Sequence, residues 1–230
     1  MRKFFSAVLL LVLTVAKLGT VSLVEAEEAL EVTPSVQKLI DGHERYLNEE
    51  TSESDTSKER REELADGQEP FAVVITCSDS RVSPEYLFDL GLGELFVVRV
   101  AGNILDEAEL GSVEYAIAEL GADTIVVLGH ESCGAVTTAV AKDIDPAAVE
   151  TTQNIDAFLD NIEPAVKEAR QSDKEDDELV ELVADLNVAN AMKQLETDSN
   201  IIKDAVKDQS VSILGAKYLL EDGDLQWFNQ

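Results

Sequence analysis

Short apolar runs alternate along this chain with stretches whose apolar residues recur at helical spacing. Residues 71–76, 95–100 and 124–128 are continuous apolar runs rich in Val, Ile and Phe, a pattern typical of buried parallel strands. Residues 34–47 and 110–120 place apolar side chains three and four positions apart, which predicts amphipathic helices, and Gly121 is expected to cap the end of the second. Strands that alternate with helices predict an α/β fold with a mostly parallel central β-sheet flanked by helices.

The C-terminal part predicts more helices and then a hairpin. Residues 211–220 favour a further strand, and the turn at 221–224 leads into 225–228 as an antiparallel edge strand. Pro146 and Pro164, in an acidic stretch, are expected to start or break helices. Helices are expected at 135–142, 179–195 and 201–206.

Residues 1–26 have the pattern of an export signal. Two basic residues are followed by an apolar run at 4–16 and by small residues that end at Ala26. The run is shorter than the roughly 20 residues of a membrane span, although an uncleaved anchor extending to Val24 is the alternative. We expect cleavage after Ala26, no stable membrane insertion afterwards, and a periplasmic or extracellular location.

The remaining residues, 27–230, are expected to form a single domain with an N-terminal helical arm at about 33–64. The chain contains 47 Asp and Glu residues against 18 Lys and Arg residues, a formal net charge of −29. Such a charge repels polyanions, which argues against nucleic acid and anionic membranes as partners. Because concentrated salt screens repulsion between like charges, we expect a salt-rich, halophilic environment.

Cys77, His130 and Cys133 are the candidate metal ligands. The chain has only two cysteines and two histidines. Cys77 directly follows the first predicted strand and His130 the third, so both are expected at the carboxyl edge of the sheet. Two thiolates and one imidazole form the donor set of a catalytic zinc with an open fourth position. A Cys77–Cys133 disulfide is the alternative in an exported, non-catalytic protein.

Asp79 and Arg81 lie close enough to Cys77 to act at the same centre. Asp79 is expected to accept a hydrogen bond from a zinc-bound hydroxide, or to displace the water and inactivate the site. Arg81 is suited to hold that carboxylate in a bidentate pair. His43, the second histidine, is expected on the surface, and Gly102 is expected to permit a tight turn after the second strand.

Residues 110–116, the dipeptide Asn187-Val188 and residues 215–218 resemble the bacterial branch of the β-class carbonic anhydrases, and three further motifs make the sequence similar to the class as a whole. The three motifs are Cys-Ser-Asp-Ser-Arg at 77–81, Arg-Val-Ala-Gly-Asn at 99–103, and Gly-His-Glu-Ser-Cys-Gly-Ala-Val at 129–136. The resemblance implies a zinc lyase, a carbonic anhydrase, that reversibly hydrates carbon dioxide to bicarbonate and a proton through attack by zinc-bound hydroxide. Some relatives instead hydrolyse carbonyl sulfide or carbon disulfide, and the motifs do not separate these activities.

The resemblance also implies an assembly and a set of site residues. It implies a homodimer or tetramer whose active site lies at the subunit interface, so that Gln68 and Phe96 can serve the neighbouring subunit. A bicarbonate-regulated subgroup carries tryptophan where Val74 stands here, so the open form with water on zinc is expected. By resemblance, one zinc per subunit is bound by Cys77, His130 and Cys133, catalysis involves Asp79 and Arg81, and the substrate is contacted by Gln68, Phe96 and Gly134.

Overall fold

The computed structural model describes residues 32–51 and 54–228. The predicted signal segment, residues 1–26, therefore lies outside the described residues. Among the described helices, none combines the length and the apolar character that a membrane crossing requires. The domain boundary expected at residue 27 stays a prediction.

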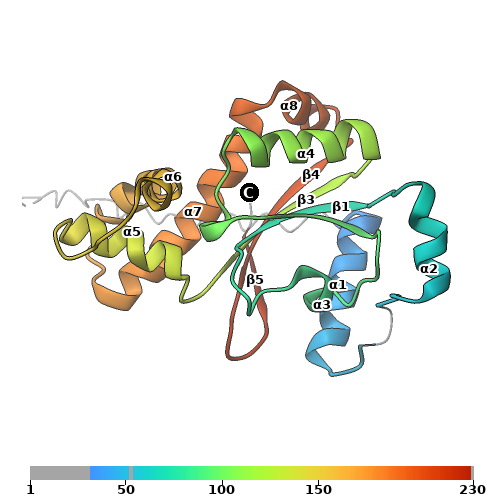
Figure 1. Cartoon of the computed structure of the whole chain (residues 1–230), viewed down its shortest axis with the longest axis horizontal. Coiled ribbons are helices and arrows are strands. Elements are labelled where there is room, and N and C mark those ends of the chain that lie inside the picture. Colours follow the sequence, from blue (N-terminus) through green and yellow to red (C-terminus); the bar gives the residue numbers. More distant parts are fainter. Residues whose placement is uncertain (1–31, 52–53, 229–230) are drawn as a thin grey trace, which may run out of the picture.

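A five-stranded sheet in the order β2-β1-β3-β4-β5 forms the centre of the molecule (Figure 1). The first four strands run parallel, and β5 lies antiparallel to β4 at one edge. This arrangement confirms the predicted α/β class, the mostly parallel sheet and the C-terminal hairpin. The strands are β1 Ala72–Thr76, β2 Leu95–Arg99, β3 Thr124–His130, β4 Ser212–Tyr218 and β5 Leu225–Phe228.

Helices cover both faces of the sheet and extend beyond one end of it (Figure 1). Alternate residues of β1 point to opposite faces: Val73 and Ile75 join α4, α7 and α8, whereas Val74 joins α1 and α3. A third apolar cluster lies among α5, α6 and α7. The helices are α1 Pro34–Leu47, α2 Lys58–Glu63, α3 Pro84–Leu87, α4 Glu107–Leu120, α5 Gly134–Ile144, α6 Gln153–Ala169, α7 Asp176–Asp198 and α8 Asn200–Lys207, with short 3₁₀ turns η1 Leu64–Asp66 and η2 Ala101–Asn103.

Helix α4 begins before the position that apolar spacing alone predicts. Asp106 and Glu109 form a capping box: the Asp106 side chain accepts a hydrogen bond from the backbone N–H of Glu109, and the Glu109 side chain accepts one from the backbone N–H of Asp106. Gly121 ends the helix in the left-handed conformation, with φ of 76°, as expected from the sequence. The first turn of α4 is therefore stabilised by polar side chains that pair with its free backbone N–H groups, and apolar periodicity carries no sign of them.

Pro164 lies inside α6, so the expectation that it starts or breaks a helix is wrong. Its ring removes one backbone donor, which would otherwise pair with the carbonyl of Asp160. Both residues face solvent, where water can satisfy that carbonyl. The opposite face buries Ile162 and Val166 against the third apolar cluster, and this packing keeps the helix continuous. Pro146, in contrast, follows the end of α5, as expected.

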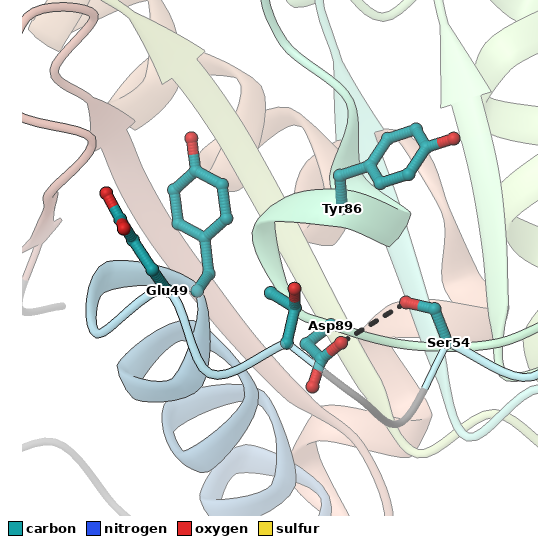
Figure 2. Close-up of a pocket in the computed structure, with 6 residues that line it drawn as sticks. Glu49, Ser54, Tyr86 and Asp89 are labelled. Carbon is teal, nitrogen blue, oxygen red and sulfur yellow. Dashed lines mark hydrogen bonds between the residues drawn. The ribbon is translucent and has the colours of Figure 1, made fainter.

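A hollow of about 500 Å³ lies where the end of α1 meets α3 (Figure 2). Asp89, fully buried, anchors this junction: Nε of Arg45 donates to its carboxylate at 2.6 Å, and the hydroxyl of Ser54 donates at 3.3 Å. Tyr46 and Tyr86 also line the hollow, and none of the predicted zinc ligands does. These contacts therefore hold the N-terminal helix against the domain, and the hollow is separate from the predicted zinc site.

His43 is buried, so the expectation of a surface histidine is wrong; the residue is only 5% exposed. It lies one helical turn after the buried Leu39 and therefore on the inner face of α1. Its Nδ1 lies 3.1 Å from the carbonyl oxygen of Leu87, and its ring stacks on Tyr46. Nε2 lies 3.8 Å from a carboxylate oxygen of Asp224 and has no hydrogen-bond partner among the described residues.

We predict that His43 makes folding stability fall in mild acid. Burial lowers its pKa, against the opposing effects of the Leu87 carbonyl and Asp224. The unfolded chain, with a histidine pKa of about 6.5, then binds the proton more readily, so stability falls as pH drops through that value. The variant His43→Asn keeps a side-chain donor and removes the titration. In urea unfolding from about pH 8 to about pH 5, the wild type should lose more stability than the variant, whereas parallel curves would contradict this prediction.

Candidate metal centre

Cys77, His130 and Cys133 converge at the carboxyl edge of the sheet, as the sequence predicts. Cys77 follows β1, His130 is the last residue of β3, and Cys133 is the N-cap of α5. Their ligand atoms all lie within 4.8 Å of one another, and all three residues are buried. The two strands are neighbours in the sheet, so their ends deliver both half-sites to one point.

The two cysteines are free, and their Sγ atoms lie 4.0 Å apart. A disulfide requires sulfur atoms about 2.05 Å apart, so the structure does not contain the alternative Cys77–Cys133 bridge. Zinc–sulfur bonds of about 2.3 Å in a tetrahedral site place two sulfurs about 3.8 Å apart. The observed separation fits a shared zinc ion.

His130 offers its second ring nitrogen to this point. Nδ1 lies 2.9 Å from the carbonyl oxygen of Glu131, to which it donates, so Nε2 carries the free lone pair. Nε2 is buried and lacks a hydrogen-bond partner in the described part of the chain. A buried imidazole nitrogen without a partner beside two sulfurs is a ligand set prepared for a metal ion.

The turn between His130 and Cys133 differs from the expected one. Because His130 and Cys133 lie three residues apart, the sequence predicts a helical turn starting near Ser132 that aims both at one point. In the structure α5 instead starts at Gly134, and Ser132 adopts a left-handed conformation with φ of 50°. The N–H of Glu131 still bonds the carbonyl oxygen of Tyr218, which prolongs the pairing of β3 with β4. Cys133 therefore lies at the N-terminus of α5, where the helix dipole stabilises a thiolate.

The two thiols influence each other's ionisation strongly. The Cys77 pKa is lowered, chiefly by a hydrogen bond from Cys133, with further help from His130 and from backbone N–H groups. The Cys133 pKa is raised, chiefly by its interaction with Cys77 and then by burial. One proton therefore stays with the pair, because a second buried thiolate beside the first requires a cation. A divalent ion supplies that charge.

Gly102 supports the Cys77 sulfur through its backbone. Its N–H lies 3.3 Å from Sγ of Cys77, and its carbonyl oxygen accepts a hydrogen bond of 2.8 Å from Nδ2 of the buried Asn187. Its φ of 74° confirms the tight turn expected after the second strand. The sequence showed Asn187 only as part of a family-like dipeptide, because no local pattern links α7 to a turn 85 residues earlier.

Asp79 and Arg81 form a bidentate ion pair beside the ligands. Nε and Nη2 of Arg81 donate to the two oxygens of Asp79 at 2.9 and 2.7 Å. The Arg81 guanidinium holds the pKa of Asp79 far below its usual range, so the carboxylate is ionised. One oxygen of Asp79 lies 3.9 Å from Nε2 of His130. The carboxylate therefore borders the metal point while it is held by Arg81.

Arg99 holds the backbone that carries this pair, and the sequence showed it only as part of a motif. Its guanidinium donates to the carbonyl oxygens of Cys77, Asp79 and Val82, with distances between 2.7 and 3.3 Å. Three carbonyls on one guanidinium fix the path of the loop after β1. No short-range pattern reveals this role, because Arg99 ends a different strand.

The three predicted substrate residues do not all gather at the metal ligands within one chain. Gly134 begins α5 next to Cys133, and open space lies where its Cβ would be. Gln68 is exposed and lines a hollow with Leu92 rather than with the ligands. Phe96 lies in the edge strand β2 and packs against Tyr115, with ring centroids 6.3 Å apart.

Comparisons with known proteins agree with this geometry. A family model described as carbonic anhydrase matches residues 72–225. Carbonic anhydrase 2 of Mycobacterium tuberculosis is 37% identical over 185 residues, which cover 80% of this chain and 87% of that protein. The carbonic anhydrase of Mycolicibacterium smegmatis is 36% identical over 188 residues, which cover 82% and 89% of the two chains.

Solved structures are also similar. The β-carbonic anhydrase CcaA matches with a TM-score of 0.69 at 27% identity, covering 84% of this chain and 87% of its own. The β-carbonic anhydrase CafA of Aspergillus fumigatus matches with a TM-score of 0.65 at 26% identity, covering 74% and 81% of the two chains. The chain belongs to the β-class carbonic anhydrase family. It is a zinc enzyme, and the activity of its family is the reversible hydration of carbon dioxide.

We predict that Gly102→Ala damages the metal centre more than a comparable glycine substitution elsewhere. A Cβ at Gly102 would lie 2.7 Å from Cδ1 of the buried Ile162 and 3.2 Å from Cβ of Ala135. Gly121, with φ of 76° and open space around its Cβ, is the matched control. Both variants carry the left-handed strain, but Gly102→Ala should lose about 1–3 kcal/mol more stability through overpacking and release zinc faster to a chelator. Equal losses in the two variants would contradict this.

Proposed function

We propose that Asp79, held by Arg81, orients the attacking water during hydration of carbon dioxide. Cys77, His130 and Cys133 fit a zinc ion by their donor atoms, their separations and the unpartnered Nε2 of His130. Bound there, zinc lowers the pKa of a coordinated water to about 7 and thereby supplies the nucleophile at neutral pH. The position of the Asp79 carboxylate at the border of this site carries the proposal.

The ionisation of Asp79 limits what this carboxylate can do. Because the Arg81 pair lowers its pKa so far, Asp79 does not retain a proton at neutral pH. It therefore acts as a hydrogen-bond acceptor that directs the water's lone pair toward the substrate carbon, and the released proton passes to solvent. Nε and Nη2 of Arg81 each donate to a different oxygen of Asp79, so Oδ2, the oxygen that lies 3.9 Å from Nε2 of His130, keeps a second lone pair with which it can accept a hydrogen bond from the water.

We predict that Asp79→Asn lowers kcat by roughly 100-fold, since misorientation of a reactant costs about this much. Asparagine presents an NH₂ donor where one carboxylate oxygen accepts, so the water loses its orientation. Zinc content should stay at the wild-type level because Asp79 is not among the clustered ligands. Stopped-flow hydration and elemental analysis measure both quantities, with Asp173→Asn, an exposed position, as the matched control. Unchanged turnover in Asp79→Asn would remove its proposed role.

We further propose that the protein is an oligomer whose active site is completed across a subunit interface. The proposal is supported by the surroundings of Gln68 and Phe96: Gln68 lines a hollow whose lining contains none of the metal ligands, and Phe96 packs against Tyr115. Two large apolar side chains near β2, an edge strand of the sheet, are also exposed to solvent: Leu92 is 40% exposed and Tyr115 is 50% exposed. A second copy against this edge would bury both and bring Gln68 toward the neighbouring site.

The oligomer proposal predicts a larger particle and a distant effect of Gln68. Light scattering should give a mass of at least two chains. Gln68→Ala should lower kcat/KM by about tenfold through loss of a substrate hydrogen bond, while zinc content and mass stay unchanged. Gln171→Ala, at an exposed position just after the end of α6, is the control. A monomer with full activity would contradict the proposal.

We also propose that the mature enzyme is exported and works in concentrated salt. The signal-like pattern of residues 1–26 and the formal net charge of −29 support this. The charge is spread over exposed surface: residues 171–178, which include five carboxylates, are all exposed, as expected for a solvated acidic segment.

The charge proposal predicts that salt stabilises the folded protein. The screening length falls from about 10 Å at 0.1 M to about 3 Å at 1 M ionic strength, so repulsion among carboxylates weakens. When the full chain is expressed, the protein recovered outside the cytoplasm should start at Glu27. The unfolding temperature of this protein should rise by several degrees between low and molar sodium chloride. An unfolding temperature that does not rise would contradict the salt adaptation, and a retained N-terminal segment would contradict the cleavage.

A further inference from the structure

The turn between the zinc ligands His130 and Cys133 is held by side-chain hydrogen bonds to both its backbone N–H and its carbonyl group. Ser132, between His130 and Cys133, has a φ of 50°, a conformation that residues with a Cβ enter only at a cost. Its N–H donates to Oε1 of Glu181 at 2.8 Å, and its carbonyl oxygen accepts from Nη2 of Arg81 at 3.4 Å. Because such a conformation persists only where neighbours fix it, these contacts are candidates for what holds the turn.

Lys217 holds Glu181 in place. Lys217 belongs to β4 and is only 7% exposed. Its ammonium nitrogen lies 3.4 Å from Oε2 of Glu181 and 2.6 Å from Oδ1 of Asp185, one helical turn further along α7. In the sheet it pairs with Gly129, the residue before His130. Its charge offsets the cost of placing Glu181 partly out of water beside the metal turn.

We propose that Glu181 is a positioning residue of the metal centre. By accepting the N–H of Ser132, its carboxylate stabilises the left-handed turn that brings His130 and Cys133 onto one ion. Lys217 keeps that carboxylate at the turn. Glu181 is absent from the clustered metal ligands and so acts through Ser132. The inference deepens the proposed function, since it rests on zinc binding at this centre.

The test compares zinc affinity among variants of the full protein. Zinc-loaded wild type, Glu181→Ala and Glu178→Ala are titrated with a chromogenic chelator, and cobalt(II)-substituted samples are compared by absorption spectroscopy. Glu178 is the matched control because it lies in the same helix, carries the same charge and has a side chain 76% exposed. Glu181→Ala should bind zinc at least about tenfold more weakly and shift the cobalt bands. Affinities of Glu181→Ala and Glu178→Ala within about twofold of each other would overturn the proposal.

A second variant separates positioning from a general structural role. Glycine adopts the left-handed conformation without the cost that serine carries. Ser132→Gly combined with Glu181→Ala should therefore recover most of the lost zinc affinity, and it serves as the test if Glu181→Ala alone does not fold. A double variant that binds zinc as weakly as Glu181→Ala, or about tenfold more weakly than Ser132→Gly alone, would overturn the proposal.

The wild type distinguishes this inference from the function on which it rests. A wild-type protein without stoichiometric zinc would contradict the metal centre itself. A wild type that binds one zinc per chain, with an affinity that Glu181→Ala matches, would overturn only the role of Glu181.

Discussion

Repulsion between two buried sulfurs is the interaction on which this site depends. Sγ of Cys77 and Sγ of Cys133 lie 4.0 Å apart in the interior, where two negative charges interact far more strongly than in water. Without a cation, the pair keeps one proton, as the opposite shifts of the two pKa values indicate. A zinc ion allows both thiolates to form and releases that proton. Metal binding, cysteine ionisation and the stability of this edge of the sheet are therefore linked.

The fold supplies this pair of sulfurs through ordinary features of parallel sheets. The neighbouring strands β1 and β3 end at the same edge, so Cys77 and His130 emerge side by side. Helix α5 then begins at Gly134, directly after its N-cap Cys133, so the positive end of the helix dipole lies next to that thiolate. Contacts from distant parts of the chain set the fine geometry: Arg99 fixes the loop after β1, and Asn187 fixes the turn at Gly102. The chemistry thus depends on residues that are not themselves reactive.

Local patterns in the sequence predicted the features that local physics determines. Continuous apolar runs located β1, β2 and β3, and Gly121 correctly marked the end of α4. The scarcity of cysteine and histidine, together with their positions after strands, predicted the zinc ligands before any geometry was known. The close pair of Asp79 and Arg81 was also predicted, because residues two positions apart can meet without help from the rest of the fold.

Local sequence patterns do not predict features that depend on long-range packing. His43 appears polar in sequence, yet tertiary contacts with α3 and the β4–β5 turn bury it. Pro164 predicted a helix boundary, but burial of the opposite face outweighs one lost hydrogen bond. Glu181 looks like one more surface carboxylate in an acidic chain, and only the tertiary structure brings it to Ser132.

The most direct test of the central claim is a thiol titration of native protein together with elemental analysis. The account predicts one zinc ion per chain, and two thiols that react in denaturant only after a chelator removes the metal. Protein without stoichiometric metal, or sulfurs that stay unreactive in denaturant until a reductant is added, would contradict it.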